Sequence, residues 1–215
     1  MTYITDILQW LGQPLHLLDA FSTLLGLLYL YLEYKANIWL WLVSIVMPAV
    51  HSVLYLKAGL YADFGMEFFY VAVAVYGFLS WKLGKHKGSG HDKKAAVPIT
   101  HFPRRLVGAT VAAFVALWAG IYLLLVEVTN STVPLYDAFT TALSIIAYWA
   151  LAKKYAEQWL LWLVVDAVCT VLYFYKSIPF SASLYGFYTV MAVVGYRKWL
   201  RLMQEQQAQQ AQQAQ

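Results

Sequence analysis

The chain has 215 residues, of which 61% are hydrophobic and 12% charged, with a net charge of +4. The charged fraction is about half that of a soluble domain, and a core of this size cannot enclose so much apolar surface, so an ordinary soluble protein is excluded. Because Cys169 is the single cysteine, an internal disulfide and a cysteine-ligated zinc site are excluded too.

The chain opens with residues 1–15, which we expect to form a short interfacial helix. Its first ten residues carry no Lys or Arg, so they do not resemble a cleavable signal peptide. Seven apolar stretches follow, each near the length of about 20 residues that a membrane-spanning helix needs. We place these spans at 19–34, 38–57, 61–81, 103–127, 134–152, 158–176 and 181–199. The sequence therefore predicts an all-α integral membrane protein with seven transmembrane helices.

Two polar segments lie outside these spans. Residues 82–102 are basic and predict a solvated cytoplasmic loop, whereas residues 203–215 form a Gln/Ala-rich tail whose composition suits a helix and disorder alike. With the N-terminus outside and the C-terminus cytoplasmic, 13 of the 15 positive residues fall on the cytoplasmic side, as the positive-inside rule favours. Since these charges lie between apolar spans, we expect a lipid membrane as the partner and no nucleic acid.

An internal repeat appears at an offset of 118 residues. The sequence Asp-Ala-Phe-Ser-Thr at 19–23 returns as Asp-Ala-Phe-Thr-Thr at 137–141. The same offset pairs Trp41 with Trp159, Gly77 with Gly195 and Trp81 with Trp199. We therefore predict two parallel three-helix repeats, at 19–81 and 137–199, joined by a connecting transmembrane helix at 103–127. Such 3+1+3 repeats are typical of transporters that bind substrate near the membrane midplane.

The sixth span carries an ionisable residue that is costly in lipid. Asp166 shares a helical face with Trp159 and Trp162, and two indoles beside a carboxylate favour a flat, cationic, aromatic ligand. Alternatively, the two Trp residues form an interfacial belt and Asp166 pairs with a neighbouring helix.

Glu67, in the third span, is the second carboxylate that we predict in the site, where it accepts a hydrogen bond from a ligand ring nitrogen or else bonds to a tyrosine. Other predicted lining residues are Gln158, Asn37, Tyr70, Tyr148 and Tyr188. No nucleotide-binding, metalloprotease or hydrolase motif is present, so we predict no enzyme activity, no cofactor and no metal site.

Several motifs resemble the Pnu family of bacterial vitamin transporters, which includes nicotinamide riboside (PnuC) and thiamine (PnuT) transporters. They are Lys-Tyr-Ala-Glu-Gln-Trp-Leu-Leu-Trp at 154–162, Val-Leu-Tyr at 171–173, Ala-Gly-Leu-Tyr-Ala-Asp at 58–63 and Tyr-Gly at 76–77. The resemblance implies a SWEET-like fold, a homotrimer in the bacterial inner membrane, and ligand contacts from Trp159 and Trp162. It also implies facilitated diffusion of a small vitamin, which a separate kinase then traps by phosphorylation.

The substrate within this family is the finer question. The Gln158 position, which is Asn in nicotinamide riboside transporters, and the two carboxylates Glu67 and Asp166 favour thiamine, with nicotinamide riboside as the alternative. A sugar transporter and a seven-helix receptor are more distant alternatives. A retinal receptor does not fit, because residues 181–196 contain no lysine.

Overall fold

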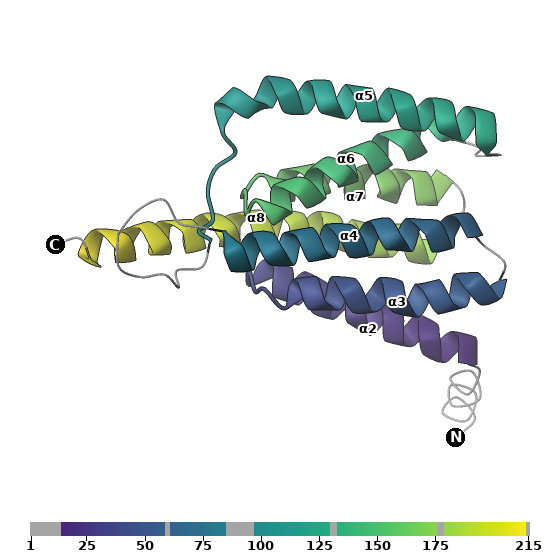
Figure 1. Ribbon diagram of the computed structural model, residues 1–215, viewed down its shortest axis with the longest axis horizontal. Helices are drawn as coiled ribbons and strands as arrows, with labels where there is room; N and C mark the ends of the chain where they lie inside the picture. The colour runs from purple at the N-terminus through teal and green to yellow at the C-terminus, as the bar shows by residue number, and fades with distance from the viewer. Residues whose placement is uncertain (1–13, 59–60, 85–96, 130–132, 176–178, 214–215) are drawn as a thin grey trace. The chain divides into compact units, whose positions relative to one another are not determined.

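The computed structural model describes residues 14–58, 61–84, 97–129, 133–175 and 179–213. Nearly all of the predicted interfacial helix, 1–15, and residues 85–96 of the predicted basic loop lie outside these ranges. The described part is all-helical, as the sequence predicts. Its helices are α2 (Pro14–Tyr34), α3 (Leu40–Ala58), α4 (Tyr61–Leu83), α5 (Arg104–Val128), α6 (Pro134–Ala152), α7 (Gln158–Tyr175) and α8 (Pro179–Gln213) (Figure 1).

The helix boundaries agree with the predicted spans to within a few residues, except at the N-terminal end of α2 and the C-terminal end of α8. Helix α8 continues through the Gln/Ala-rich tail for 35 residues in all, so it is about 50 Å long and exceeds the hydrocarbon thickness of about 30 Å. Among the described residues, α5, α6 and α7 are each long and apolar enough to cross a membrane.

The chain divides into two compact units, Met1–Phe78 and Leu79–Gln215. In the first unit α2 packs on α3, and the Trp41 ring of α3 lies directly on Gly77 of α4, where a Cβ atom would overlap the indole. Close approach of two helices through a glycine is common in membrane proteins, because it increases van der Waals contact where no hydrophobic effect drives association.

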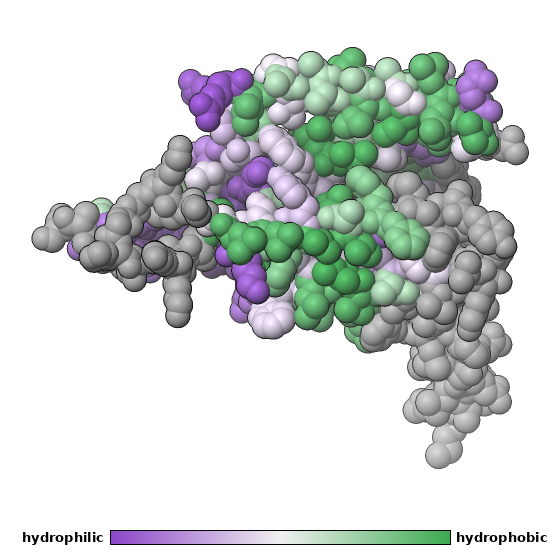
Figure 2. Space-filling model, viewed as in Figure 1, coloured by the Kyte–Doolittle hydropathy of each residue, from purple (hydrophilic) through white to green (hydrophobic). Residues whose placement is uncertain are grey.

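In the second unit, neighbouring helices pack in the order α5, α6, α7, α8. Rings of Phe114 and Trp118 on α5 meet Phe139 on α6, and Trp118 Nε1 donates to the Leu135 carbonyl at 3.1 Å. Helix α5 has no buried residue, and Figure 2 shows apolar side chains along it with hydrophilic residues at both ends. That distribution suits a helix whose outer face contacts lipid.

The turns between α2 and α3 and between α6 and α7 have the same backbone structure. Seven backbone hydrogen bonds of 2.8–3.3 Å recur at the offset of 118 residues, from Lys35 to Val43 in one turn and from Lys153 to Leu161 in the other. Ala36 and Lys154 occupy equivalent places with positive φ angles of 50° and 55°. Each turn thus reverses the chain through a single residue in the left-handed region.

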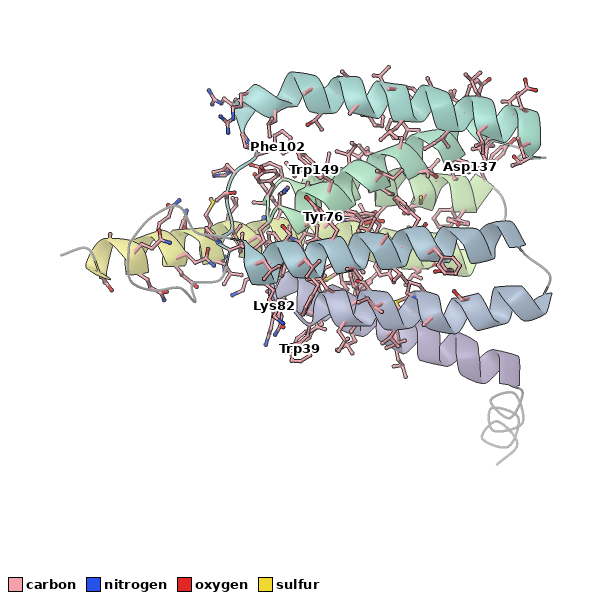
Figure 3. The ribbon with its side chains drawn as sticks, viewed as in Figure 1. Trp39, Tyr76, Lys82, Phe102, Asp137 and Trp149 are labelled. Atoms are coloured by element: carbon pink, nitrogen blue, oxygen red, sulfur yellow. The ribbon has the colours of Figure 1, made fainter. Side chains whose placement is uncertain are left out.

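A short segment that precedes α5, residues 97–103, is bound to the second turn, and we call it the strap. Thr100 exchanges backbone hydrogen bonds with Lys154 and Ala156, at 3.1 and 3.0 Å. The Phe102 ring lies edge-on to Trp149 and Tyr155, and Figure 3 shows it beside Trp149.

Two side chains and one glycine contact also hold the same strap. The Glu157 carboxylate accepts hydrogen bonds from the Phe102 amide and from His101 Nδ1, both at 2.7 Å. Gln206 of α8 accepts a hydrogen bond from the Ile99 amide at 3.0 Å. At the start of the strap, Val97 contacts Gly84, so closely that a Cβ atom on the glycine would overlap it. The strap therefore links the end of α4, the α6–α7 turn and α8.

Candidate functional site

One stripe of α7 carries the polar groups that lie within its apolar surface. Gln158, Trp162 and Asp166 stand four residues apart, which places them on one side of the helix at steps of about 6 Å. The stripe overlaps the face predicted from sequence, because Trp159 lies about 20° from Asp166 around the helix.

The carboxylate of Asp166 is buried, with 7% of the residue exposed. Within the described ranges no side chain or backbone group forms a hydrogen bond or ion pair with it, so the predicted alternative of a helix-pairing aspartate has no partner there. Its carboxyl group instead lies near the phenol groups of Tyr185 and Tyr188 of α8. A buried acid without a partner among the described residues is costly within a membrane span, which makes Asp166 a candidate site residue.

Aromatic rings of α6 and α8 meet the aromatic rings of α7. Tyr148 of α6 meets Trp162 edge-to-face, with centroids 5.0 Å apart. Tyr173 and Tyr185 stack at 5.1 Å, and Tyr185 also meets Tyr188 at 6.0 Å. Both predicted tyrosines of the second unit, Tyr148 and Tyr188, are therefore close to the α7 stripe.

Tyr185 is a member of this group that the sequence analysis missed. Two signals point to it: it precedes Tyr188 by one turn of α8, and it is the repeat counterpart of Glu67 at the offset of 118. Aromatic residues are so frequent in this chain that a single tyrosine has no distinctive pattern.

Several buried polar atoms near the stripe have no hydrogen-bond partner within the described ranges. They are both amide atoms of Gln158 and the indole Nε1 atoms of Trp159 and Trp162. Buried polar groups in native proteins are nearly always paired with protein, water or ligand. Three adjacent orphaned side chains therefore indicate a place where a polar ligand or ordered water completes the structure.

Trp159 has a second role that the sequence did not suggest. Its ring lies on Gly195 of α8, where a Cβ atom would stand 2.6 Å from the indole, and it meets Trp199 edge-to-face at 6.1 Å. This contact repeats that of Trp41 on Gly77. Trp159 thus packs α7 against α8, while Trp162 stands on the stripe with Asp166.

The remaining predicted residues, Glu67, Asn37 and Tyr70, belong to the first unit. Glu67 is buried, with 6% exposed. The Asn37 Oδ1 atom accepts a hydrogen bond from the Trp39 amide at 3.0 Å, so it stabilises the start of α3. Tyr70 is partly exposed and lies edge-on to Phe69. For Asn37 the observed contact is structural.

The chemistry available at the α7 stripe is recognition rather than catalysis. A carboxylate with no counter-ion in the described part of the chain, together with several ring edges and faces, suits a flat cation, which the rings attract through their quadrupoles. Within the described ranges, no group of three His, Cys, Asp or Glu side chains is placed to hold a metal ion.

Known proteins with similar sequences are transporters. The family model described as "Nicotinamide mononucleotide transporter" matches residues 16–201. The "Nicotinamide riboside transporter PnuC" of Escherichia coli (strain K12) is 22% identical over 91% of this chain and 90% of its own length. The "Riboflavin/roseoflavin transporter RibM" of Streptomyces davaonensis is 30% identical over 84% of this chain and 83% of its own length.

A solved structure has the same fold. It is described as "Crystal structure of the Vitamin B3 transporter PnuC" and superposes with a TM-score of 0.68, covering 94% of this chain and 88% of that one at 22% identity. The family resemblance expected from the sequence motifs is thereby confirmed.

Proposed function

We propose, from the premise that this chain belongs to the nicotinamide mononucleotide transporter family, that it carries nicotinamide riboside across the membrane. Its membership makes it a vitamin transporter of the PnuC family. The choice of substrate within that class rests on the site.

The observation that carries the proposal is the unpaired, buried carboxylate of Asp166 beside the rings of Trp162, Tyr185 and Tyr188. Nicotinamide riboside has a flat pyridinium ring with a fixed positive charge, so it supplies the counter-ion that Asp166 lacks. Its ribose hydroxyls are donors of the kind that a carboxylate accepts. Riboflavin, named for the relative at 30% identity, has a neutral ring and gains no such charge attraction.

Thiamine, which the sequence analysis preferred, becomes the second candidate. None of the relatives described above is named for thiamine, and two of the three proteins are named for vitamin B3 or its riboside. Thiamine stays a candidate because its thiazolium ring also has a fixed charge to pair with Asp166.

Other features of the transport cycle also belong to the proposal. The matching turns and the two Trp-on-Gly contacts support a SWEET-like 3+1+3 arrangement of parallel repeats. We also propose an inner-membrane homotrimer with the N-terminus outside and the C-terminus cytoplasmic. It contains no nucleotide-hydrolysing motif, so we propose facilitated diffusion with trapping by a separate kinase.

The test is a titration of the purified protein with nicotinamide riboside, thiamine and riboflavin in turn, followed by tryptophan fluorescence and calorimetry. We expect nicotinamide riboside to bind tightest, and Asp166→Asn to weaken that binding by about 10- to 100-fold, because a charge-assisted contact is replaced by a neutral one. The thermal stability of the empty variant should not fall, since the variant removes an unpaired buried charge.

Binding of thiamine alone would replace nicotinamide riboside as the substrate and leave the role of Asp166 standing. Equal affinity of the wild type and Asp166→Asn for the bound vitamin would contradict the assigned role of the carboxylate.

A further inference from the structure

Gln158 presents an unusual combination of burial and missing partners. The residue is 0% exposed, and within the described ranges neither its amide oxygen nor its amide nitrogen has a hydrogen-bond partner. A buried amide in this state is unfavourable, because it has lost its hydrogen bonds to water and no described protein group replaces them. The Gln158 amide therefore calls for a partner that the described residues do not supply.

The equivalent position in the first turn is a natural comparison. Leu40 occupies it with the same backbone hydrogen-bond pattern, and it is also 0% exposed. An apolar side chain thus fits this place in the turn, so packing alone does not require an amide at Gln158.

Trp162 and Asp166 extend the same stripe toward the middle of the helix. They follow Gln158 at steps of about 6 Å along α7, and the Trp162 indole N–H is a further buried donor without a described partner. From one end to the other, the stripe presents a neutral amide, an aromatic ring and a carboxylate.

We propose that Gln158 is a specificity-determining residue that recognises a neighbouring donor and acceptor on the edge of the vitamin ring. This inference rests on the proposed function. The carboxamide of nicotinamide riboside is such an edge, and two amides can pair through two hydrogen bonds. The groups of this vitamin then follow the order of the stripe: the carboxamide at Gln158, the ring at Trp162, and the ring charge and ribose at Asp166.

The test is a cycle of two proteins and two ligands. The proteins are the wild type and Gln158→Leu, which copies the first turn. The ligands are nicotinamide riboside and its analogue with a methyl group in place of the carboxamide, which keeps the ring charge and the ribose. We expect the wild type to bind the analogue about 10- to 100-fold more weakly, and the variant to bind both ligands alike.

An equal loss in both proteins would overturn the proposal, because Gln158 would then take no part in recognising the amide. If an ordered water is the sole partner of Gln158, the Gln158→Leu variant will bind both ligands with the same affinities as the wild type. That result would overturn the proposal as well.

A stability measurement on the empty protein adds an independent readout. Gln158→Leu should raise the Tm, because an unpaired amide is removed, whereas the control Gln206→Leu should lower the Tm and leave vitamin affinity unchanged, because it breaks the hydrogen bond to Ile99. A fall in the Tm of Gln158→Leu would overturn the proposal.

Failure of the proposed function remains distinguishable from failure of this inference. In thiamine, the pyrimidine amino group and the neighbouring ring nitrogen form a donor–acceptor edge. If the wild type binds thiamine instead, the same cycle is run with thiamine and with an analogue that lacks this amino group. If the wild type binds none of the three vitamins, both proposals fall.

Discussion

The α2–α3 turn and the α6–α7 turn are two copies of one backbone with different surroundings. Their hydrogen bonds match one for one, and each contains a residue with positive φ. Only the second turn is held by the strap, through the backbone of Thr100 and the carboxylate of Glu157. The comparison teaches that backbone geometry sets how the chain reverses, while the side chains decide which copy acquires polar chemistry.

Two of the positions that differ between the copies lie where function is proposed. Leu40 becomes Gln158, and Pro48 becomes Asp166. By contrast, the tryptophan on each third-helix glycine is retained in both copies. Packing contacts have been kept, whereas the buried polar residues occupy different positions in the two copies: Glu67 of the first copy corresponds to Tyr185 of the second.

The largest expected effect tests whether the two copies pack alike. Gly77→Ala and Gly195→Ala should each destabilise the protein by about 3 kcal/mol, because the new methyl group overlaps Trp41 or Trp159. Thermal unfolding in detergent measures this loss. Gly186→Ala, whose Cβ would lie 3.8 Å from its nearest neighbour, is the control and should be neutral or stabilising. A loss of stability in Gly195→Ala but not in Gly77→Ala would contradict the view that the two copies pack alike.

The next effect concerns Lys154, whose equivalent in the first turn is Ala36. Its Nζ atom donates to the Val97 carbonyl at 2.9 Å and stands 4.1 Å from the Trp81 ring centroid, yet burial lowers the pKa of Lys154 from its ordinary 10.5 to about 8. Between these two values the unfolded chain binds more protons than the folded one, so stability rises with pH in that window.

Between pH 8 and 10 we therefore expect Lys154 to contribute a rise in unfolding free energy on the order of 2 kcal/mol. Chemical denaturation at several pH values measures it. Lys154→Met should flatten the rise, whereas Lys153→Met, which leaves the buried amine in place, should keep it. An identical pH profile for wild type and Lys154→Met would exclude this source.

A smaller effect concerns the attachment of the strap. Glu157→Ala should cost about 1–2 kcal/mol, because it leaves the Phe102 amide and His101 without their acceptor. The first-turn equivalent, Trp39, is 59% exposed, so Trp39→Ala should change stability by less than about 0.5 kcal/mol. Equal losses of unfolding free energy in Glu157→Ala and Trp39→Ala would show that the contact with the strap does not distinguish the two turns. Amide hydrogen exchange at residues 99–102 reports the same event locally.

The smallest effect tests the shared backbone. Ala36→Gly should stabilise the protein by about 1 kcal/mol, because glycine adopts a positive φ without strain. Lys154→Gly should destabilise it instead, since it removes the contacts with Val97 and Trp81. Two changes of the same sign would contradict the view that only the second turn uses its side chain.

The helices and the buried aspartate of α7 were predictable from sequence, because hydropathy marks a span and an aspartate stands out within one. The length of α8 was not, since a Gln/Ala tract lacks the periodic pattern that predicts a packed helix. The strap was also out of reach: Glu157 and His101 lie 56 residues apart, and no local pattern announces such a contact. Tyr185 was missed because only its proximity to Asp166, which lies on another helix, makes it a candidate site residue.

The contact between Gly84 and Val97 has a practical consequence for engineering. These two residues flank positions 85–96, and they touch each other, so the two ends of that segment lie at nearly one point. A reporter domain whose own ends lie close together can be spliced in there without separating the strap from α4. Since the strap is bound to the turn that begins α7, we expect such a fusion to be coupled to the proposed vitamin site, so that its fluorescence reports substrate in living cells.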